Sequence, residues 1–257
     1  MSTMIDIDEL RGKVRTVYQQ VAADPHAGFH FETGRGLAER LGYEAYDLDR
    51  IPAAAIDSFA GVGYHMDLAG LTGGQRVLDL GSGSGMDSFV AALRVGPAGA
   101  VFGLDMTDEQ LAKAGALAAR HGFEQVSFER GYIEEIPLER GSVDAVISNG
   151  VINLAADKEA VFREIARVLE PGGRMAISDI VTEKELTENI VCDTSLWAAC
   201  IGGAAQQDRY RAVIEAAGLH LESVRDNPQY RFLSKSARGA SETFGVKSVS
   251  LAATKPV

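Results

Sequence analysis

The segment Val77-Leu78-Asp79-Leu80-Gly81-Ser82-Gly83-Ser84-Gly85 decides the fold of this 257-residue chain. A short apolar run contains one acidic residue, three alternating glycines follow, and an apolar pattern with helical spacing begins after Met86. This order predicts a buried β-strand, a tight loop and the first turn of a helix. Glycine lets such a loop bend sharply and lets a ligand approach the backbone closely, so we expect a binding site here.

Two kinds of ligand fit a strand, a glycine-rich loop and a helix: a dinucleotide and S-adenosylmethionine. The dinucleotide pattern requires glycine at the sixth position counted from Gly81, where this chain has Met86. Asp79 would repel a pyrophosphate but could pair with an ammonium, such as the amino group of a methionine moiety. The next strand, expected at residues 100–104, precedes Asp105, where a carboxylate can bind both hydroxyls of a ribose. The residues therefore favour S-adenosylmethionine, with a nicotinamide dinucleotide as the alternative.

Composition bounds the class of partner and the compartment. The net charge is −11 and no run of basic residues occurs, which argues against nucleic acid and favours a small-molecule substrate. Cys192 and Cys200 are the only cysteines, so no disulfide framework is expected. The N-terminus lacks a signal-peptide core and no apolar stretch approaches the length of a membrane span. We expect a cytoplasmic protein with no membrane partner; composition does not fix its oligomeric state.

From Arg76 onward, strands and helices alternate, which predicts a parallel sheet with helices on both faces. Strands are expected at residues 76–80, 100–104, 126–128, 143–147, 175–178, 220–224 and 249–253, and helices at about 86–94, 108–121, 158–169 and 208–217. The sequence Thr107-Asp108-Glu109-Gln110 is a capping box for the second of these helices. Residues 184–205 are expected to form helical pieces that cap the sheet, and the stretch between the last two strands is expected to be irregular. The fold class is therefore α/β, a doubly wound and mostly parallel seven-stranded sheet.

The first 70 residues predict a helical extension or lid that precedes a catalytic domain at residues 71–257. Helices are expected at residues 9–22, 37–41 and 53–58. His26 and His30 are four residues apart, but Pro25 and Gly28 make a regular helix doubtful there, so no metal site is expected. Residues 59–65 combine glycines and aromatics, which fits either a loop that folds over a ligand or a plain connection.

Several segments together resemble one known family. Residues 77–87, Gly103-Leu104-Asp105-Met106-Thr107 and residues 147–154 resemble class I S-adenosylmethionine-dependent methyltransferases. The particular sequences of residues 149–154 and 197–204 resemble the arsenite methyltransferase family more narrowly. The resemblance covers about residues 36–220 and implies a Rossmann-like methyltransferase fold with S-adenosylmethionine as cofactor.

The resemblance also implies roles for individual residues in the cofactor site. The methionine portion would be held by Asp79, Gly81, Ser82, Gly83 and Gly85. The ribose and adenine would be bound by Asp105, Met106, Ile133 and Glu134. Asn149 and Gly150 would face the sulfonium, and Tyr18 could close over the cofactor or pack its own helix onto the domain.

The acceptor side departs from the family. Its members carry cysteines at the positions of Val62 and Gly150; of the arsenic-binding thiols only Cys200 remains here, and Cys192 is extra. An organic acceptor is therefore favoured, and methylation of a trivalent arsenical by means of Cys200 is the alternative. An oxidoreductase that uses NAD and a module that binds the cofactor without catalysis remain further alternatives.

Three other residues are candidates for the acceptor site. Trp197 and Tyr64 are candidate walls of an acceptor pocket, and His65 is a candidate general base for an acceptor that must lose a proton. Each of the three also fits a purely structural role.

Overall fold

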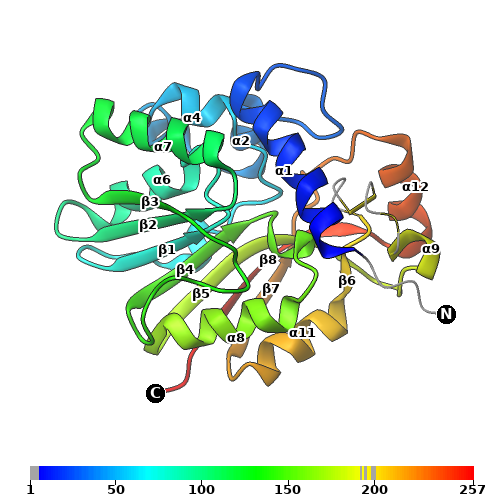
Figure 1. Cartoon of the computed structure of the whole chain (residues 1–257). Coiled ribbons are helices and arrows are strands. Elements are labelled where there is room, and N and C mark those ends of the chain that lie inside the picture. Colours follow the sequence, from blue (N-terminus) through cyan, green and yellow to red (C-terminus); the bar gives the residue numbers. More distant parts are fainter. Residues whose placement is uncertain (1–5, 192, 194–195, 198–200) are drawn as a thin grey trace.

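A single twisted sheet runs through the molecule, and the computed structural model describes residues 6–191, 193, 196–197 and 201–257. Its strand order is β3-β2-β1-β4-β5-β8-β7 (Figure 1). The bounds are β1 Arg76–Leu80, β2 Ala100–Asp105, β3 Val126–Arg130, β4 Val143–Asn149, β5 Leu169–Thr182, β7 His220–Asp226 and β8 Lys247–Thr254. The first five strands along this order are parallel, and β8 is antiparallel to both of its neighbours. The expected doubly wound, mostly parallel sheet is confirmed, and a two-residue strand, β6 (Ala205–Gln206), pairs with β5 in addition.

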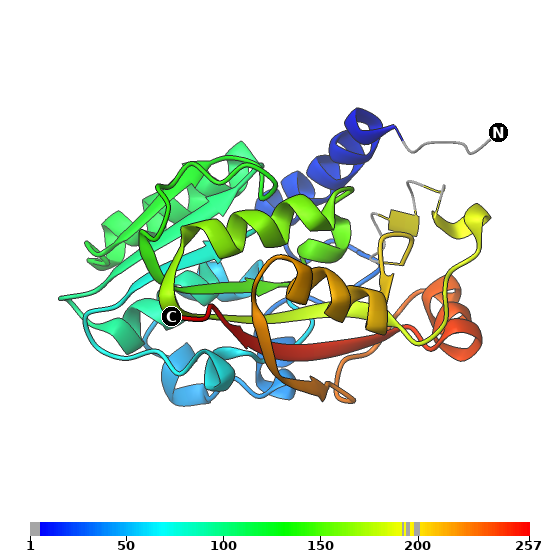
Figure 2. The same ribbon diagram turned by 90° about the horizontal axis from the view of Figure 1, so that it is seen from below.

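Helices cover both faces of this sheet. On one face, α6 (Met86–Val95) and α7 (Asp108–His121) lie against the first strands, and their apolar side chains share a core with Val77 and Ile147. On the other face, α8 (Lys158–Val168) and α11 (Gln207–Ala216) pack over a second core that includes Leu78 and Leu80 (Figure 2). Because β1 is buried from both sides, its run of apolar residues is nearly continuous.

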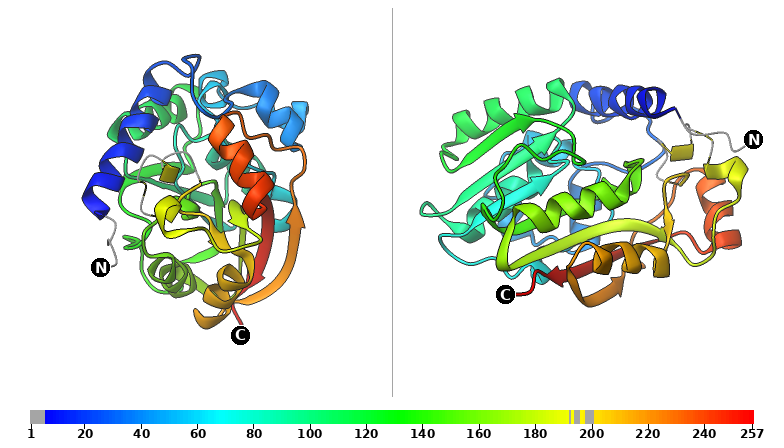
Figure 3. Two further views of the ribbon diagram at one scale, coloured as in Figure 1. Left: turned by 90° about the vertical axis from the view of Figure 1, so that its right-hand side faces the viewer. Right: turned by 60° about the horizontal axis from the view of Figure 1, so that its bottom comes forward.

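The N-terminal residues form five helices, of which the last four pack on the first face. Their bounds are α1 Ile7–Ala23, α2 Arg35–Leu41, α3 Ala45–Leu48, α4 Ala53–Asp57 and α5 Met66–Ala69. Side chains from α2 to α5 belong to the same core as α6. Helix α1 instead packs against α7, and Figure 3 shows it continuing outward beyond that helix.

The region expected to be irregular between the last two strands contains helix α12 (Lys235–Phe244). The Ser234 side chain caps its N-terminus and Gly245, in the left-handed conformation, ends it. The buried residues of this helix are the small side chains of Ala237 and Ala240, which lie on one face of an amphipathic sequence. The expectation of an irregular stretch is therefore wrong here. Among the described residues no helix is long and apolar enough to span a membrane.

Candidate functional site

A cavity opens at the carboxyl ends of β1, β2 and β4, where ligands bind in open α/β sheets. Its empty space is roughly 1070 Å³ when the open solvent at its mouth is counted. The glycine loop forms its floor, residues 55–61 and helix α1 form two walls, and residues 131–134 and 151–155 complete it. The order of the strands thus brings together residues that the sequence separates widely.

The backbone of the glycine loop has a shape that side chains would not permit. Gly81, Gly83 and Gly85 have φ angles of 70°, 53° and 89°, in the left-handed region that favours glycine. A Cβ atom at Gly81 would lie 2.3 Å from the Val151 side chain, and one at Gly85 would lie 2.8 Å from Phe128. The loop therefore depends on glycine for its path and for its close packing on Val151, which follows β4, and on β3.

Two buried carboxylates stand at the inner end of the cavity. Asp79 is 2% exposed and accepts a hydrogen bond from Ser88 Oγ at 2.6 Å. Burial, together with the nearby charge of Asp87, raises the pKa of Asp79 well above its ordinary value. Asp87 accepts from the Tyr43 hydroxyl at 2.5 Å and from Asn149 Nδ2 at 3.1 Å.

In the described part of the chain these side-chain donors are all neutral, so the acid pair has no protein cation beside it. A cationic group entering the cavity would stabilise both carboxylates. The pair therefore fits the ammonium of an amino acid moiety. The sequence pattern gives no separate signal for Asp87, which follows the glycine loop and Met86.

Asp105 lies where β2 ends and is tied to the glycine loop. Its Oδ2 accepts from the Gly83 N–H at 2.9 Å, and its Oδ1 accepts from the Thr107 N–H at 2.8 Å. Burial raises the pKa of Asp105, while these backbone N–H groups act in the opposite direction. The carboxylate lines the cavity together with Met106. An acidic residue at this position, at the end of the second strand, can accept hydrogen bonds from the hydroxyls of a ribose.

Tyr18, Ser82, Ile133, Glu134 and Asn149 also line the cavity, as does Gln110, which was not singled out as a site residue. The Ser82 hydroxyl is buried and has no hydrogen-bond partner among the described residues, which leaves it available to a ligand. Glu134 pairs with Arg11 of α1 at 3.3 Å across the cavity mouth.

Asn149 joins the loop between α4 and α5 to the end of β4. Its Oδ1 accepts from the N–H groups of Val62 and Gly63, at 2.8 and 3.3 Å. Its Nδ2 donates to the carbonyl of Gly63 at 3.1 Å. Next to it, Gly150 is in the left-handed region, and a Cβ there would lie 3.1 Å from Val62 Cγ1. Positions 62 and 150 are therefore neighbours in space.

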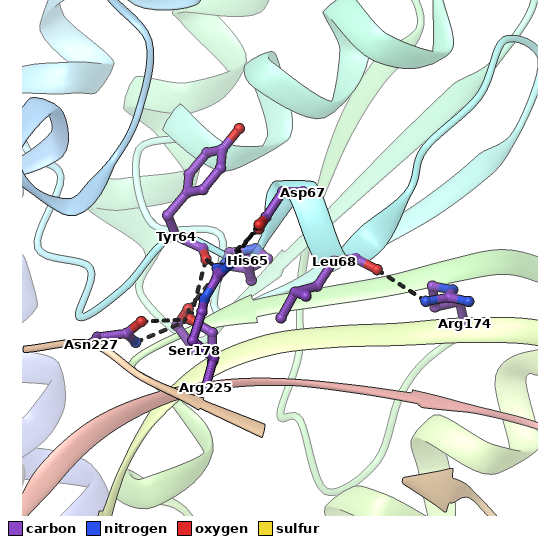
Figure 4. A network of polar contacts seen from close by, with 9 residues as sticks. Tyr64, His65, Asp67, Leu68, Arg174, Ser178, Arg225 and Asn227 are labelled. Carbon is purple, nitrogen blue, oxygen red and sulfur yellow. Dashed lines mark hydrogen bonds and ion pairs between the residues drawn. The ribbon is translucent and has the colours of Figure 1, made fainter. Parts of the chain in front are cut away.

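His65 does not reach the cavity. Its side chain is fully buried, and Nδ1 lies 3.5 Å from Ser178 Oγ of β5, within the polar network shown in Figure 4. Burial lowers the pKa of His65, and its Nε2 has no partner among the described residues. The described lining of the cavity does not include His65, so this position gives no support to the general-base role expected for it.

Tyr64 and Trp197 are also absent from the lining of the cavity. The Tyr64 ring packs edge-on against Tyr43 at 4.8 Å between centroids. Trp197 donates from Nε1 to the Val191 carbonyl at 2.6 Å and faces Lys158 Nζ at 4.9 Å, beside a separate cavity. Gly150 too lies behind the wall formed by its neighbours rather than on the cavity surface. Cys192 and Cys200 lie outside the described residues.

The capping box predicted at the start of α7 does not form. Thr107 is the N-cap, but its side chain makes no capping hydrogen bond, and its N–H donates to Asp105. This leaves the Gln110 side chain free to bind elsewhere, and its amide accepts from Ser84 Oγ of the glycine loop and donates to the Tyr18 carbonyl. The helix starts where expected, but Thr107 and Gln110 line the cavity instead of capping the helix with their side chains.

Comparison with known proteins agrees with this geometry. A family model described as a methyltransferase domain matches residues 71–218. An arsenite methyltransferase from Halobacterium salinarum is 42% identical over 193 residues, covering 75% of this chain and 49% of that protein. Another, from Aquipseudomonas alcaligenes, is 48% identical over 166 residues, covering 62% of this chain and 48% of that protein. The chain thus spans about half the length of these curated relatives.

A solved structure of another arsenic methyltransferase is also similar to this chain, and the match covers a larger share of that protein. The crystal structure of an arsenic(III) S-adenosylmethionine methyltransferase from Chlamydomonas reinhardtii is 32% identical, with a TM-score of 0.70. The match covers 82% of this chain and 72% of that one. The chain belongs to the S-adenosylmethionine-dependent methyltransferase family, in the branch that contains the arsenite methyltransferases.

Proposed function

We propose that this chain transfers the methyl group of S-adenosylmethionine to a small organic acceptor. The proposal rests on one cavity whose two ends differ in polarity. Its inner end holds the acid pair Asp79 and Asp87 beside the glycine loop, and its outer wall is apolar, with Leu10 and Val14 of α1 facing Leu154. A cofactor with an ammonium and a sulfonium fits the first part, and a largely apolar acceptor fits the second.

Four groups of this chain would hold the cofactor. Asp79 and Asp87 would bind its ammonium, Asp105 its ribose, and Met106 and Ile133 its adenine, with the backbone of the glycine loop beneath them. When bound, S-adenosylmethionine supplies a methyl group that is already activated by the sulfonium. The protein then contributes alignment and the exclusion of water, and the walls of α1 and residues 151–155 supply both.

The acceptor would have to enter with its nucleophilic atom already deprotonated, because the described part of the cavity offers no evident general base. The described lining of the cavity contains no histidine, lysine or cysteine. Three of its carboxylates, Asp79, Asp87 and Asp105, are engaged with the loop or with the proposed cofactor contacts, and Glu134 is paired with Arg11. Soft nucleophiles such as thiolates fit this site better than groups that a protein base must deprotonate.

A trivalent arsenical is the second candidate, because the relatives named above are arsenite methyltransferases. Positions 62 and 150 touch in the structure, which is how two thiols there would converge on one atom. Valine and glycine at these positions offer no ligand for arsenic. Only Cys200 would remain from the family's set, and a single thiolate would hold arsenite weakly.

A mass-spectrometric methylation assay tests the proposal with thiols, phenols, amines, arsenite and methylarsenite as acceptors. We expect a methylated organic product that persists in Cys200→Ser. An arsenical product that disappears in Cys200→Ser would instead establish the second candidate. Binding of S-adenosylhomocysteine without any product from the panel would indicate a binding module, and failure to bind it would overturn the proposal altogether.

A further inference from the structure

Gln110 joins the glycine loop to helix α1. Its side chain is 1% exposed and lies between Ser84 and the backbone of Tyr18. Ser84 Oγ donates to Oε1, and Nε2 donates to the Tyr18 carbonyl at 2.9 Å. Because a carbonyl can only accept, the bond to Tyr18 fixes which end of the amide faces the loop. One buried side chain thus holds two elements of the cavity together.

Helix α1 carries the wall of the cavity that an acceptor would meet. Leu10, Val14 and Tyr18 follow one another at intervals of four residues and therefore share one face of the helix. All three line the cavity. Gln110 donates to the carbonyl of Tyr18 and accepts from Ser84, so it fixes the distance between this face of α1 and the glycine loop.

Lys113 anchors the same helix without touching the loop. It follows Gln110 by three residues on α7, and its Nζ donates to Ser58 Oγ at 2.8 Å and to the Ala22 carbonyl at 3.3 Å. Lys113 does not line the cavity. The two residues therefore form a natural pair for comparison, since both hold α1 and only Gln110 also contacts the glycine loop.

We propose that Gln110 is a positioning residue that couples occupation of the glycine loop to the order of α1. The inference rests on the proposed function, because it takes the loop to be the cofactor site. Local opening of the loop breaks the bond between Ser84 and Gln110, and fraying of α1 breaks the bond between Gln110 and Tyr18. A ligand that suppresses the first opening leaves Gln110 fixed and so disfavours the second. Cofactor binding then reduces the local unfolding of α1, the helix that the acceptor would contact.

Hydrogen exchange of the full chain, with and without S-adenosylhomocysteine, tests this coupling in three proteins: wild type, Gln110→Met and Lys113→Met. In the wild type we expect the ligand to slow exchange in the glycine loop and, by about fivefold or more, in α1. In Gln110→Met the loop should still be protected while the effect on α1 is lost. In Lys113→Met, α1 should exchange faster throughout, yet the ligand should slow it by the wild-type factor.

The outcomes separate this inference from the proposed function. No protection anywhere in the wild type would mean that the ligand does not bind, and the proposed function would fail. Protection of the loop without α1 in the wild type, or full protection of α1 in Gln110→Met, would overturn the coupling alone. Ser84→Ala removes only the bond on the loop side and should also abolish the effect on α1, which gives a second variant if Gln110→Met does not fold.

Discussion

Asp105 serves the backbone and the cavity at once, since it accepts from two N–H groups and faces the space above the loop. Asp105→Asn keeps the shape of the side chain but replaces one acceptor oxygen with a donor. We expect the affinity for S-adenosylhomocysteine to fall about 10- to 100-fold, because hydrogen bonds to a charged group contribute roughly 1.5–3 kcal/mol. Titration calorimetry measures this, with the exposed carboxylate of Asp108 changed to Asn as the control. Equal affinities for the two variants would remove Asp105 from the ribose site.

His65 gives the fold a dependence on pH. Burial lowers its pKa below the ordinary 6.5, and the charges of Asp87 and Asp67 only partly oppose this. As the pH falls below about 6.5, the unfolded chain takes up a proton at this residue and the folded protein does not, so stability decreases. We therefore expect the difference in Tm between wild type and His65→Gln to be smaller at pH 5.5 than at pH 7.5.

Scanning calorimetry at the two pH values measures this difference. The carboxyl groups of Asp79, Asp105 and Asp179 have raised pKa values, and each favours the folded state as the pH falls. They are present in both proteins and so cancel in the comparison. A difference in Tm that stays constant with pH would show that His65 takes up protons equally in the folded and unfolded states.

The sequence locates site residues whose position follows from their own strand. Asp79 and Asp105 lie at or near the ends of apolar runs, so the strand pattern alone puts them at the edge of the sheet. Asp87 and Gln110 have no such signal. Their roles come from Tyr43 and Tyr18, which are 44 and 92 residues away in the chain. Contacts of this range arise only once the sheet is assembled.

Among the elements, the glycine loop offers a direct test of close packing. Gly81 and Gly83 both have positive φ, so alanine at either position is strained by a similar amount of about 1–2 kcal/mol. At Gly81 the new methyl group would also overlap Val151 at 2.3 Å, whereas at Gly83 the nearest atom is 3.9 Å away. We expect Gly81→Ala to be less stable than Gly83→Ala by a further ~1–3 kcal/mol.

Urea unfolding of both variants measures the gap between them. Adding Val151→Ala to Gly81→Ala should recover part of the loss, because it removes the two methyl groups closest to the new atom. No recovery, or equal stability of the two single variants, would contradict close packing of the loop on residue 151.

Elements with strong apolar periods are predictable, and those made by tertiary context are not. Most of the long helices and the strands of the main sheet follow from their patterns. The ten-residue helix α12 is an exception, because the sequence predicts an irregular stretch there, and α3 and α5, at four residues each, are too short to give a period. Strand β5 is much longer than its apolar core, because it runs through Pro171-Gly172-Gly173, where the sequence indicates a break. At these residues the extended conformation depends on pairing with another segment, since the Gly172 N–H donates to the Lys255 carbonyl at 2.8 Å.

At the scale of the molecule, the N-terminal 70 residues do not behave as one unit. Helix α1 packs on α7 at the surface, whereas α2 to α5 are built into the core beneath β1. Large apolar side chains of this second group are almost fully buried there: Leu41, Tyr43, Leu48, Ile51, Ile56, Phe59 and Met66. The alternation of strands and helices predicts a boundary near residue 70, but the shared core extends across it.

Two truncations test where the dispensable part ends. Removal of residues 1–33 takes away α1, and we expect the remaining chain to fold with a lower Tm and to bind S-adenosylhomocysteine more weakly, because Gln110, which contacts the glycine loop, loses its bond to the Tyr18 carbonyl. Removal of residues 1–70 withdraws the buried side chains named above. At roughly 1.5–3 kcal/mol each, their loss reaches the whole stability of an ordinary domain, about 5–15 kcal/mol, so this fragment should not fold. Circular dichroism and thermal unfolding distinguish the two outcomes. A cooperative, ligand-binding fragment 71–257 would show that α2 to α5 are an accessory layer and that the domain begins at residue 71.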